Sequence, residues 1–569
     1  MLPLRIFRSF RANYYGDDVL TGPDAYPEEY FAECAEHGFN AVWLRGILRD
    51  LAPSDIFPTL GSEIARHQDA LGTVVERARR HGVQVLLYLN EPLCLPVDHP
   101  FWAEHADVCG VRGESSMDEW YDTFAFCTST PEVRGWLREV SKRLFRAIPE
   151  LGGWFLITAS EHHTHCYSHI WDAATGGRPN CPRCAMREAS QVVAEVIKAL
   201  YDGTKASNPR AHTIAWNWGW SHFEADPQPV LLSRLPKDVP VLLDWERGGF
   251  RAMPDGKRIF VDEYSLGYVG PSKRFMAGYR AARRYGLPVM AKLQVGTTHE
   301  LATVPNLPLV DNLYAKLSDV EQLGLSGILA TWNFGNSFTL NTAAVGAFVN
   351  TTERPAPEVF VSRLAEVYCP GADGEKVAAA VERFSTAMLY FPFDMWMLYF
   401  GPQNYALAYP LTLEPLTGKP MGRSWVMDER GDDLAAALKQ YTLEEAIGYF
   451  QQLYAEWQDG VALLEDGLAA SAHPHATQEL NNARIIGHCF RSTVNVFRVY
   501  QLRRDRPADA DTQFHAILED EIANLETALP IIDADPRLGF HAECQQYQFS
   551  AEQVREKLAE MRKQLVTVC

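Results

Sequence analysis

The feature that most constrains the fold is an alternation of short apolar runs with amphipathic stretches over about the first 345 residues. Such runs are typical of buried strands, and the stretches between them have the 3.6-residue spacing of helices. The predicted strands span residues 4–10, 40–45, 83–90, 153–159, 212–218, 239–245, 287–295 and 327–333. Eight strand–helix units predict a (β/α)8 TIM barrel. An open doubly wound sheet is the alternative, but the glycine-rich phosphate loop of that class is not found.

The helices expected between these strands end in several cases at a glycine, which is a common stop signal. The clearest of them span residues 27–37, 71–81, 131–148, 185–201, 273–285 and 309–323. A further strand-like run at 258–267 follows the sixth strand, and we interpret it as an excursion within that loop.

The sequence changes after about residue 355 to long helical periodicity, which predicts a mainly α-helical C-terminal domain. We therefore divide the chain into a catalytic barrel domain (residues 1–350) and a helical domain (351–569). The predicted C-terminal helices span residues 374–389, 442–469, 475–505, 509–528 and 551–565. An aromatic-rich connector at 390–410 contains too many prolines and glycines for one helix. It is expected either to pack the two domains together or to cover the site.

The charge balance excludes some partners. The chain has 53 Lys+Arg against 72 Asp+Glu, a formal net charge of −19, and it contains no basic run. This disfavours nucleic acid and anionic membrane surfaces. Eleven cysteines in 569 residues do not suggest a disulfide scaffold, and no signal-peptide core or spanning segment is visible. We expect a cytoplasmic protein, and the sequence is compatible with a homo-oligomer.

Carboxylates and aromatic rings dominate the ends of the predicted strands, where a barrel carries its chemistry. The candidate residues at these ends are Glu161, Trp216, Trp218, Asp244, Glu246, Glu263, Glu300, Trp332 and Asn333. Hydrolysis of a glycosidic bond needs two placed carboxyl groups, and sugar faces stack on aromatic rings. This set therefore predicts a glycosidase with a carbohydrate substrate and no organic cofactor.

The candidates differ in strength. Glu161 ends the fourth strand among several histidines, where a carboxylate without a purpose would be costly. For the other carboxylates a salt-bridging or helix-capping role is the alternative. The three tryptophans are expected to bind sugar or else to pack at the barrel rim, and Asn333 is expected to hydrogen-bond the sugar.

A group of cysteines and histidines follows Glu161. Cys181-Pro-Arg-Cys184 has the C-x2-C spacing of metal ligands, and Cys166 precedes it. We expect a structural zinc, with unligated buried thiols as the alternative. A different enzyme class would use His162, His163 and His165 around a catalytic zinc.

These residues carry a family resemblance. The stretch Ser160-Glu161 … Cys166 … Cys181-Pro-Arg-Cys184-Ala-Met-Arg-Glu-Ala resembles the fourth-strand region of family 42 β-galactosidases, over about a hundred residues. The segment from His81 to Trp102 is similar to that family's third unit. The resemblance implies that Glu161 is the acid/base. It also implies zinc ligation by the cysteines at positions 127, 166, 181 and 184.

The same resemblance places the nucleophile at the end of the seventh strand, which implies Glu300, with Asp244 and Glu246 as competitors. Ser160 stands where the family has an asparagine, so the substrate is left open. A looser similarity is to the N-acetylhexosaminidases of families 20 and 123, which use an Asp-Glu pair. Asp262-Glu263 is such a pair at a strand end.

The expected function is therefore an exo-acting glycoside hydrolase that cleaves a β-linked hexose or N-acetylhexosamine with two carboxylates. The alternatives are the His-ligated zinc hydrolase and a non-catalytic carbohydrate-binding barrel.

Overall fold

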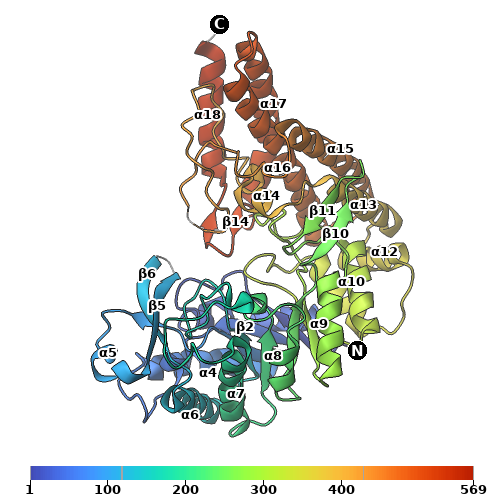
Figure 1. Ribbon diagram of the computed structural model, residues 1–569. Coiled ribbons are helices and arrows are strands. Elements are labelled where there is room, and N and C mark those ends of the chain that lie inside the picture. Colours follow the sequence, from blue (N-terminus) through green and yellow to red (C-terminus); the bar gives the residue numbers. More distant parts are fainter. Residues whose placement is uncertain (1, 117–119, 427, 568–569) are drawn as a thin grey trace. The chain divides into compact units, whose positions relative to one another are not determined.

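The fold is built on a closed barrel of eight parallel strands (Figure 1), in a computed structural model that describes residues 2–116, 120–426 and 428–567. In spatial order the strands are β1 (Leu4–Phe7), β2 (Ala41–Arg45), β3 (Gln84–Leu89), β7 (Gly153–Ile157), β8 (His212–Trp216), β9 (Val241–Asp244), β12 (Val289–Lys292) and β13 (Gly327–Leu329). All eight lie within the predicted runs, so the (β/α)8 barrel is confirmed. The open sheet is excluded because β13 pairs with β1.

Helices follow the strands as predicted. They are α2 (Glu28–Glu36), α4 (Ile64–Arg80), α6 (Pro131–Ala147), α7 (Ala189–Lys205), α8 (Pro229–Arg234), α9 (Lys273–Arg284), α10 (Val310–Gln322) and α11 (Leu340–Asn350). Local signals set their starts. The Thr130 side chain accepts the Val133 N–H ahead of Pro131, and Ser272 caps α9 in the same way.

Two small sheets are inserted in the barrel loops. The first contains β4 (Leu95–Pro96), β5 (Cys109–Ser116) and β6 (Trp120–Phe126), and sequence reasoning did not anticipate it. The second is the antiparallel hairpin of β10 (Gly249–Ala252) and β11 (Arg258–Val261). This hairpin is the excursion expected after the sixth strand.

The chain separates into two compact units. We call residues 1–245, 272–293 and 320–330 the barrel unit, and residues 246–271, 294–319 and 331–569 the helical unit. All eight barrel strands belong to the barrel unit. The loops after β9, β12 and β13 belong to the helical unit.

The interior of the barrel is filled by large rings from four neighbouring strands. Phe155 contacts Trp43, Tyr88 and Trp216, with ring centroids 5.5, 5.2 and 6.1 Å apart. All four side chains are buried. A packed aromatic layer of this kind fixes the strand ends above it.

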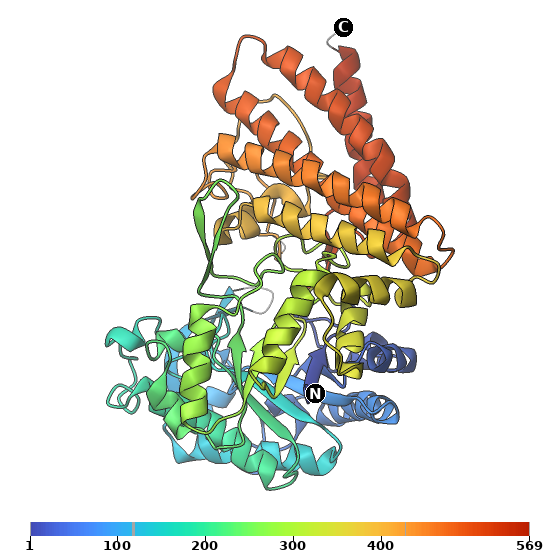
Figure 2. The same cartoon turned by 90° about the vertical axis from the view of Figure 1, so that its right-hand side faces the viewer.

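The helical unit contains α12 (Pro357–Tyr368), α13 (Gly374–Ala387), α14 (Met395–Phe400), α15 (Leu443–Leu468), α16 (Pro474–Asp505), α17 (Ala510–Ala534) and α18 (Ala551–Thr567). The long helices pack in succession, as the yellow-to-red helices of Figure 2 show. Trp457 lies at the centre, 4.3 Å from the Phe384 ring. The connector is broken into short segments, one of which is the helix α14, and it buries Phe391, Phe393 and Tyr405 in this core. None of the described helices combines the length and the low charge that a bilayer-spanning segment needs.

Candidate active site

Glu161 lies just beyond β7, at the carboxyl end of the barrel strands. Its side chain is 40 % exposed, while the neighbouring His162 is fully buried. Tyr14 Oη donates to Glu161 Oε1 at 3.4 Å, and His162 Nε2 lies 3.4 Å from the same oxygen. The carboxylate is therefore reachable from solvent and held from below by buried polar groups.

Those polar groups come from several strand ends. Tyr14 Oη lies 3.3 Å from His162 Nε2, and Arg45 Nη2 lies 3.4 Å from the same nitrogen. Asn90 Nδ2 donates to Ser160 Oγ at 3.3 Å, which fixes the residue before Glu161. Burial raises the pKa of Tyr14 well above its ordinary value, so its phenol stays protonated as a donor.

Asp244 is the last residue of β9 and is also buried. It accepts a hydrogen bond from Trp216 Nε1 at 2.8 Å, and its register partner in β12 is Lys292. The Trp216 ring has no exposed surface, so in this structure it positions Asp244 and packs inside the barrel. Trp218 is half-buried in the turn after β8.

An open cleft of about 890 Å3 in the barrel unit contains Glu161. One wall is β5, and the other is the loop after Glu161 with His163, His169 and Trp171. Ring centroids along this loop are 4.9 Å apart for His163 and His169 and 5.3 Å for His169 and Trp171, both stacked. Trp171 is 47 % exposed. The cleft thus has a ladder of flat rings leading outward from the carboxylate.

A glycine allows this wall to close on the histidines. A Cβ placed on Gly113 of β5 would lie 2.8 Å from the His163 ring, which is shorter than side-chain contacts allow. The sequence signal for β5 and β6 was the strand-like composition of residues 120–126, which sequence reasoning overlooked.

The histidines after Glu161 do not converge on one point. His163 Nδ1 lies 2.7 Å from Thr123 Oγ1, while His165 Nε2 lies 2.8 Å from the Thr158 carbonyl. Burial lowers the pKa of His163 to about 3 and that of His165 to about 4, so both are neutral. Across the described ranges, neither of the two groups of metal-ligating side chains includes His162, His163 or His165. The structure therefore does not assemble the predicted catalytic zinc site.

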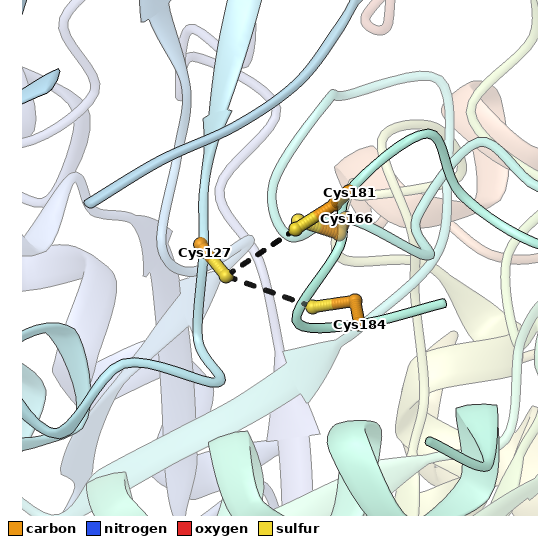
Figure 3. A group of neighbouring side chains, drawn as sticks. All are labelled: Cys127, Cys166, Cys181 and Cys184. Carbon is orange, nitrogen blue, oxygen red and sulfur yellow. Dashed lines mark hydrogen bonds between the residues drawn. The ribbon is translucent and has the colours of Figure 1, made fainter. Parts of the chain in front are cut away.

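The four cysteines do converge (Figure 3). The Sγ atom of Cys127, which follows β6, lies 3.7 Å from those of Cys181 and Cys184. All four ligand atoms of Cys127, Cys166, Cys181 and Cys184 lie within 4.8 Å of one another, and all four residues are buried. The loop after β7 is thereby joined to the end of β6.

Neighbouring groups favour the thiolate form of Cys127 and Cys181 in this cluster. Arg183 Nε donates to Cys127 Sγ at 3.1 Å, and its two Nη atoms each donate to a backbone carbonyl at 2.6 Å. Hydrogen bonding from Cys166 lowers the pKa of Cys127 and lowers that of Cys181 to about 6. The same contacts raise the pKa of Cys166, which acts as the protonated donor.

Glu246 and Glu300 are fully buried in the helical unit. Glu300 accepts hydrogen bonds from Ser265 Oγ at 2.6 Å, Thr298 Oγ1 at 2.9 Å and the Leu266 N–H at 3.1 Å. Glu246 pairs with buried Lys316 at 2.6 Å, and Lys316 also donates to the Ser265 carbonyl at 2.6 Å. Both carboxylates thus hold the segment around Ser265.

The helical unit also gathers the remaining predicted residues. Glu263 accepts the Tyr264 N–H at 2.9 Å and a hydrogen bond from Tyr399 Oη. The Trp332 N–H donates to Gln294 Oε1 at 2.7 Å, and Asn333 Nδ2 donates to Glu543 Oε1 at 3.4 Å.

Sequence reasoning did not identify several residues that lie near the predicted ones in the helical unit. Tyr399 was placed only in the aromatic connector. Trp425, His541 and Glu543 lie in short turns or two-residue strands, which have no periodicity that a sequence could display. The structure thus distributes the predicted site residues between the two units.

No protein-family model and no curated protein matches the sequence. Among solved structures, the chain is similar to a family 138 glycoside hydrolase that targets the pectin rhamnogalacturonan II. The TM-score is 0.55 at 9 % identity, covering 100 % of this chain and 84 % of that one. At this identity the likeness shows the fold.

Two further matches have lower TM-scores. One is CpGH84B, with a TM-score of 0.40 and 9 % identity over 97 % of this chain and 76 % of that one. The other is a GH5_18 protein from Streptomyces cattleya in complex with GlcNAc, with a TM-score of 0.36 and 14 % identity over 68 % and 92 %. The structural neighbours are glycoside hydrolases, but the resemblance to family 42 and to families 20 and 123 is not confirmed.

Proposed function

We propose that the protein is a glycoside hydrolase in which Glu161 is the general acid. The observation that carries the proposal is the position of Glu161: a 40 % exposed carboxylate beyond a barrel strand, lining a cleft with stacked rings. Barrel enzymes place their chemistry at this end of the strands. The glycoside hydrolases among the structural neighbours share the fold of this chain, which supports the proposal.

We further propose Asp244 as the second carboxylate. Glu300 and Glu246 are the other candidates, but both belong to the helical unit, whereas Asp244 belongs to the barrel unit together with Glu161. Asp244 is the last residue of β9 and Glu161 follows β7, and these two strands flank β8. Two strand spacings of about 4.8 Å separate these strand ends. Side chains can bring carboxylates at that spacing to the roughly 5–9.5 Å that glycosidases use.

In the proposed reaction, Glu161 protonates the glycosidic oxygen as its bond to the anomeric carbon breaks. Asp244 either attacks that carbon or deprotonates a water, and the separation of the two carboxylates decides which. The rings of His169 and Trp171 offer stacking surfaces to the leaving group. The substrate class carried over from the resemblance is a β-linked hexose or N-acetylhexosamine removed from a chain end.

The test compares two leaving groups across a panel of sugars presented as 4-nitrophenyl and methyl glycosides. Glu161→Gln should lower kcat by about 10²–10⁴-fold for methyl glycosides and less for 4-nitrophenyl glycosides, because a good leaving group needs no acid. Asp244→Asn should lower both about equally. Glu114→Gln, on the same cleft wall, should leave both unchanged.

Turnover by Glu161→Gln that equals wild type on methyl glycosides would exclude Glu161 as the acid. A wild-type protein that binds sugars but turns over none of the panel would favour a non-catalytic binding barrel.

We also propose that Cys127, Cys166, Cys181 and Cys184 hold a structural zinc. Sulfurs that share a tetrahedral Zn2+ at about 2.3 Å are about 3.8 Å apart. The two measured separations of 3.7 Å support this assignment. An all-thiolate set has no open position for catalysis, so the ion would anchor the loop that carries Glu161.

A further inference from the structure

A second group of metal-ligating side chains lies in the helical unit. It consists of His299, His541 and Glu543, and one nitrogen or oxygen atom from each lies within 4.8 Å of the others. Their exposed fractions are 6 %, 0 % and 7 %. His299 is in the loop after β12, whereas His541 ends β14 (Phe540–His541) and Glu543 follows two residues later. Two distant segments therefore bring three ligating groups to one buried place.

The His541 ring points to a ligand. Its Nε2 atom is buried and has no hydrogen-bond partner among the residues that the structure describes. Burying a polar nitrogen in this way costs free energy unless something binds it. Its Nδ1 atom accepts the Glu543 N–H at 3.3 Å. Metal binding through Nε2 requires the other tautomer, and the long Nδ1 contact is a weak one to give up.

We propose that His299, His541 and Glu543 bind a divalent transition-metal ion. Two imidazoles and one carboxylate form the donor set that holds Zn2+ with an open position, and it also suits Fe2+. Ligand atoms sharing an ion at about 2.1 Å lie about 3–4 Å apart, so small side-chain rotations close the group from within 4.8 Å.

The surroundings fit a metal site. Asn333 Nδ2 donates to Glu543 Oε1 at 3.4 Å, which orients the carboxylate as outer-shell hydrogen bonds do. The Phe334 ring lies 4.5 Å from His299 and 5.7 Å from His541, and Trp425 lies 5.6 Å from His299. An ion here would have nitrogen and oxygen ligands, an aromatic wall and coordination positions left for water or a ligand oxygen.

This site is distinct from the cysteine cluster, and cobalt separates the two. The full-length protein is stripped with a chelator and dialysed against Co2+, and bound metal is counted by elemental analysis. Cobalt on thiolates gives sulfur-to-metal charge-transfer absorption, whereas cobalt on imidazole and carboxylate gives only d–d bands. Wild type should bind two equivalents and show both signals.

Variants assign each equivalent. The double variant Cys181→Ser/Cys184→Ser should keep one Co2+ and lose the charge-transfer band. With all four cysteines intact, the single variants His541→Ala and Glu543→Ala should each lose one equivalent of Co2+ and keep the charge-transfer band. His515→Ala, a partly exposed histidine of α17, should lose neither. Circular dichroism checks that each variant is folded.

The proposal is overturned if wild type binds only one equivalent at saturating Co2+, or if His541→Ala binds as much metal as wild type. Both readouts use wild type or a single variant, so they stand even if the double cysteine variant does not fold. Zn2+ titration by calorimetry should repeat the count.

Discussion

Removing the zinc anchor should destabilise the barrel unit by a calculable amount. The change is Cys181→Ser/Cys184→Ser, which preserves side-chain size and removes two of the four proposed ligands. In the folded protein, Cys127 is joined through the cluster to residues 54 and 57 positions along the chain. The proposed zinc would therefore act as a cross-link that closes a loop of this length.

The chain-entropy relation for cross-links gives about 4 kcal/mol for such a loop. A unit of this size changes its Tm by about 2 °C per kcal/mol, so the variant should melt about 8 °C below wild type. Treatment of wild type with a strong chelator should produce a shift of similar size. Cys109→Ser removes a nearby thiol outside the cluster and should leave the Tm unchanged.

The assay is differential scanning calorimetry together with zinc analysis of the purified protein. Wild type should contain zinc that the double variant lacks. The reasoning is refuted if wild type carries no metal on these sulfurs, or if the chelator removes zinc and the Tm stays the same.

Three further outcomes follow from buried groups and from the cleft. Lys316→Met leaves Glu246 buried without its partner, which should cost about 3–5 kcal/mol in urea unfolding, and adding Glu246→Gln should restore most of it. Burial raises the pKa of Glu91 to about 7, so folding favours the protonated carboxyl. The stability that this group contributes is fully present below the unfolded pKa of about 4.3 and is lost as the pH rises through 7. Glu91→Gln should therefore reduce the fall in Tm between about pH 4 and 7, and an unchanged slope over this range would contradict the assignment. Trp171→Ala should raise KM for oligosaccharides more than for 4-nitrophenyl monosaccharides, and equal effects would remove the ring ladder from leaving-group binding.

The barrel could be predicted because its strands are buried on both faces. β2 and β7 consist entirely of buried residues, so each reads as one apolar run. Of the hairpin of β10 and β11, only β11 was visible in the sequence, as part of the separate run at 258–267. In the sheet of β4, β5 and β6, the strand-like composition of residues 120–126 was overlooked. The strand β5, which forms the cleft wall, contains polar and glycine residues that break the apolar signal.

The site was only partly predictable. Glu161 and the C-x2-C pair are local features, whereas Cys127 lies 54 residues before Cys181 and was proposed only from the resemblance. Glu246 and Glu300 follow strands, as catalytic groups do, but their buried partners Lys316 and Ser265 come from other segments. Strand position alone cannot distinguish a reactive carboxylate from one that holds a loop in place.

The division of the chain into two units limits where the protein can be truncated or recombined. The backbone passes from one unit to the other five times between residues 245 and 331. A truncation near residue 350 would leave the barrel strands with three loops deprived of the core they fold against. Neither unit can be exchanged as a single cassette, and recombination within this gene should be tolerated only where it spares the whole interval from 245 to 331.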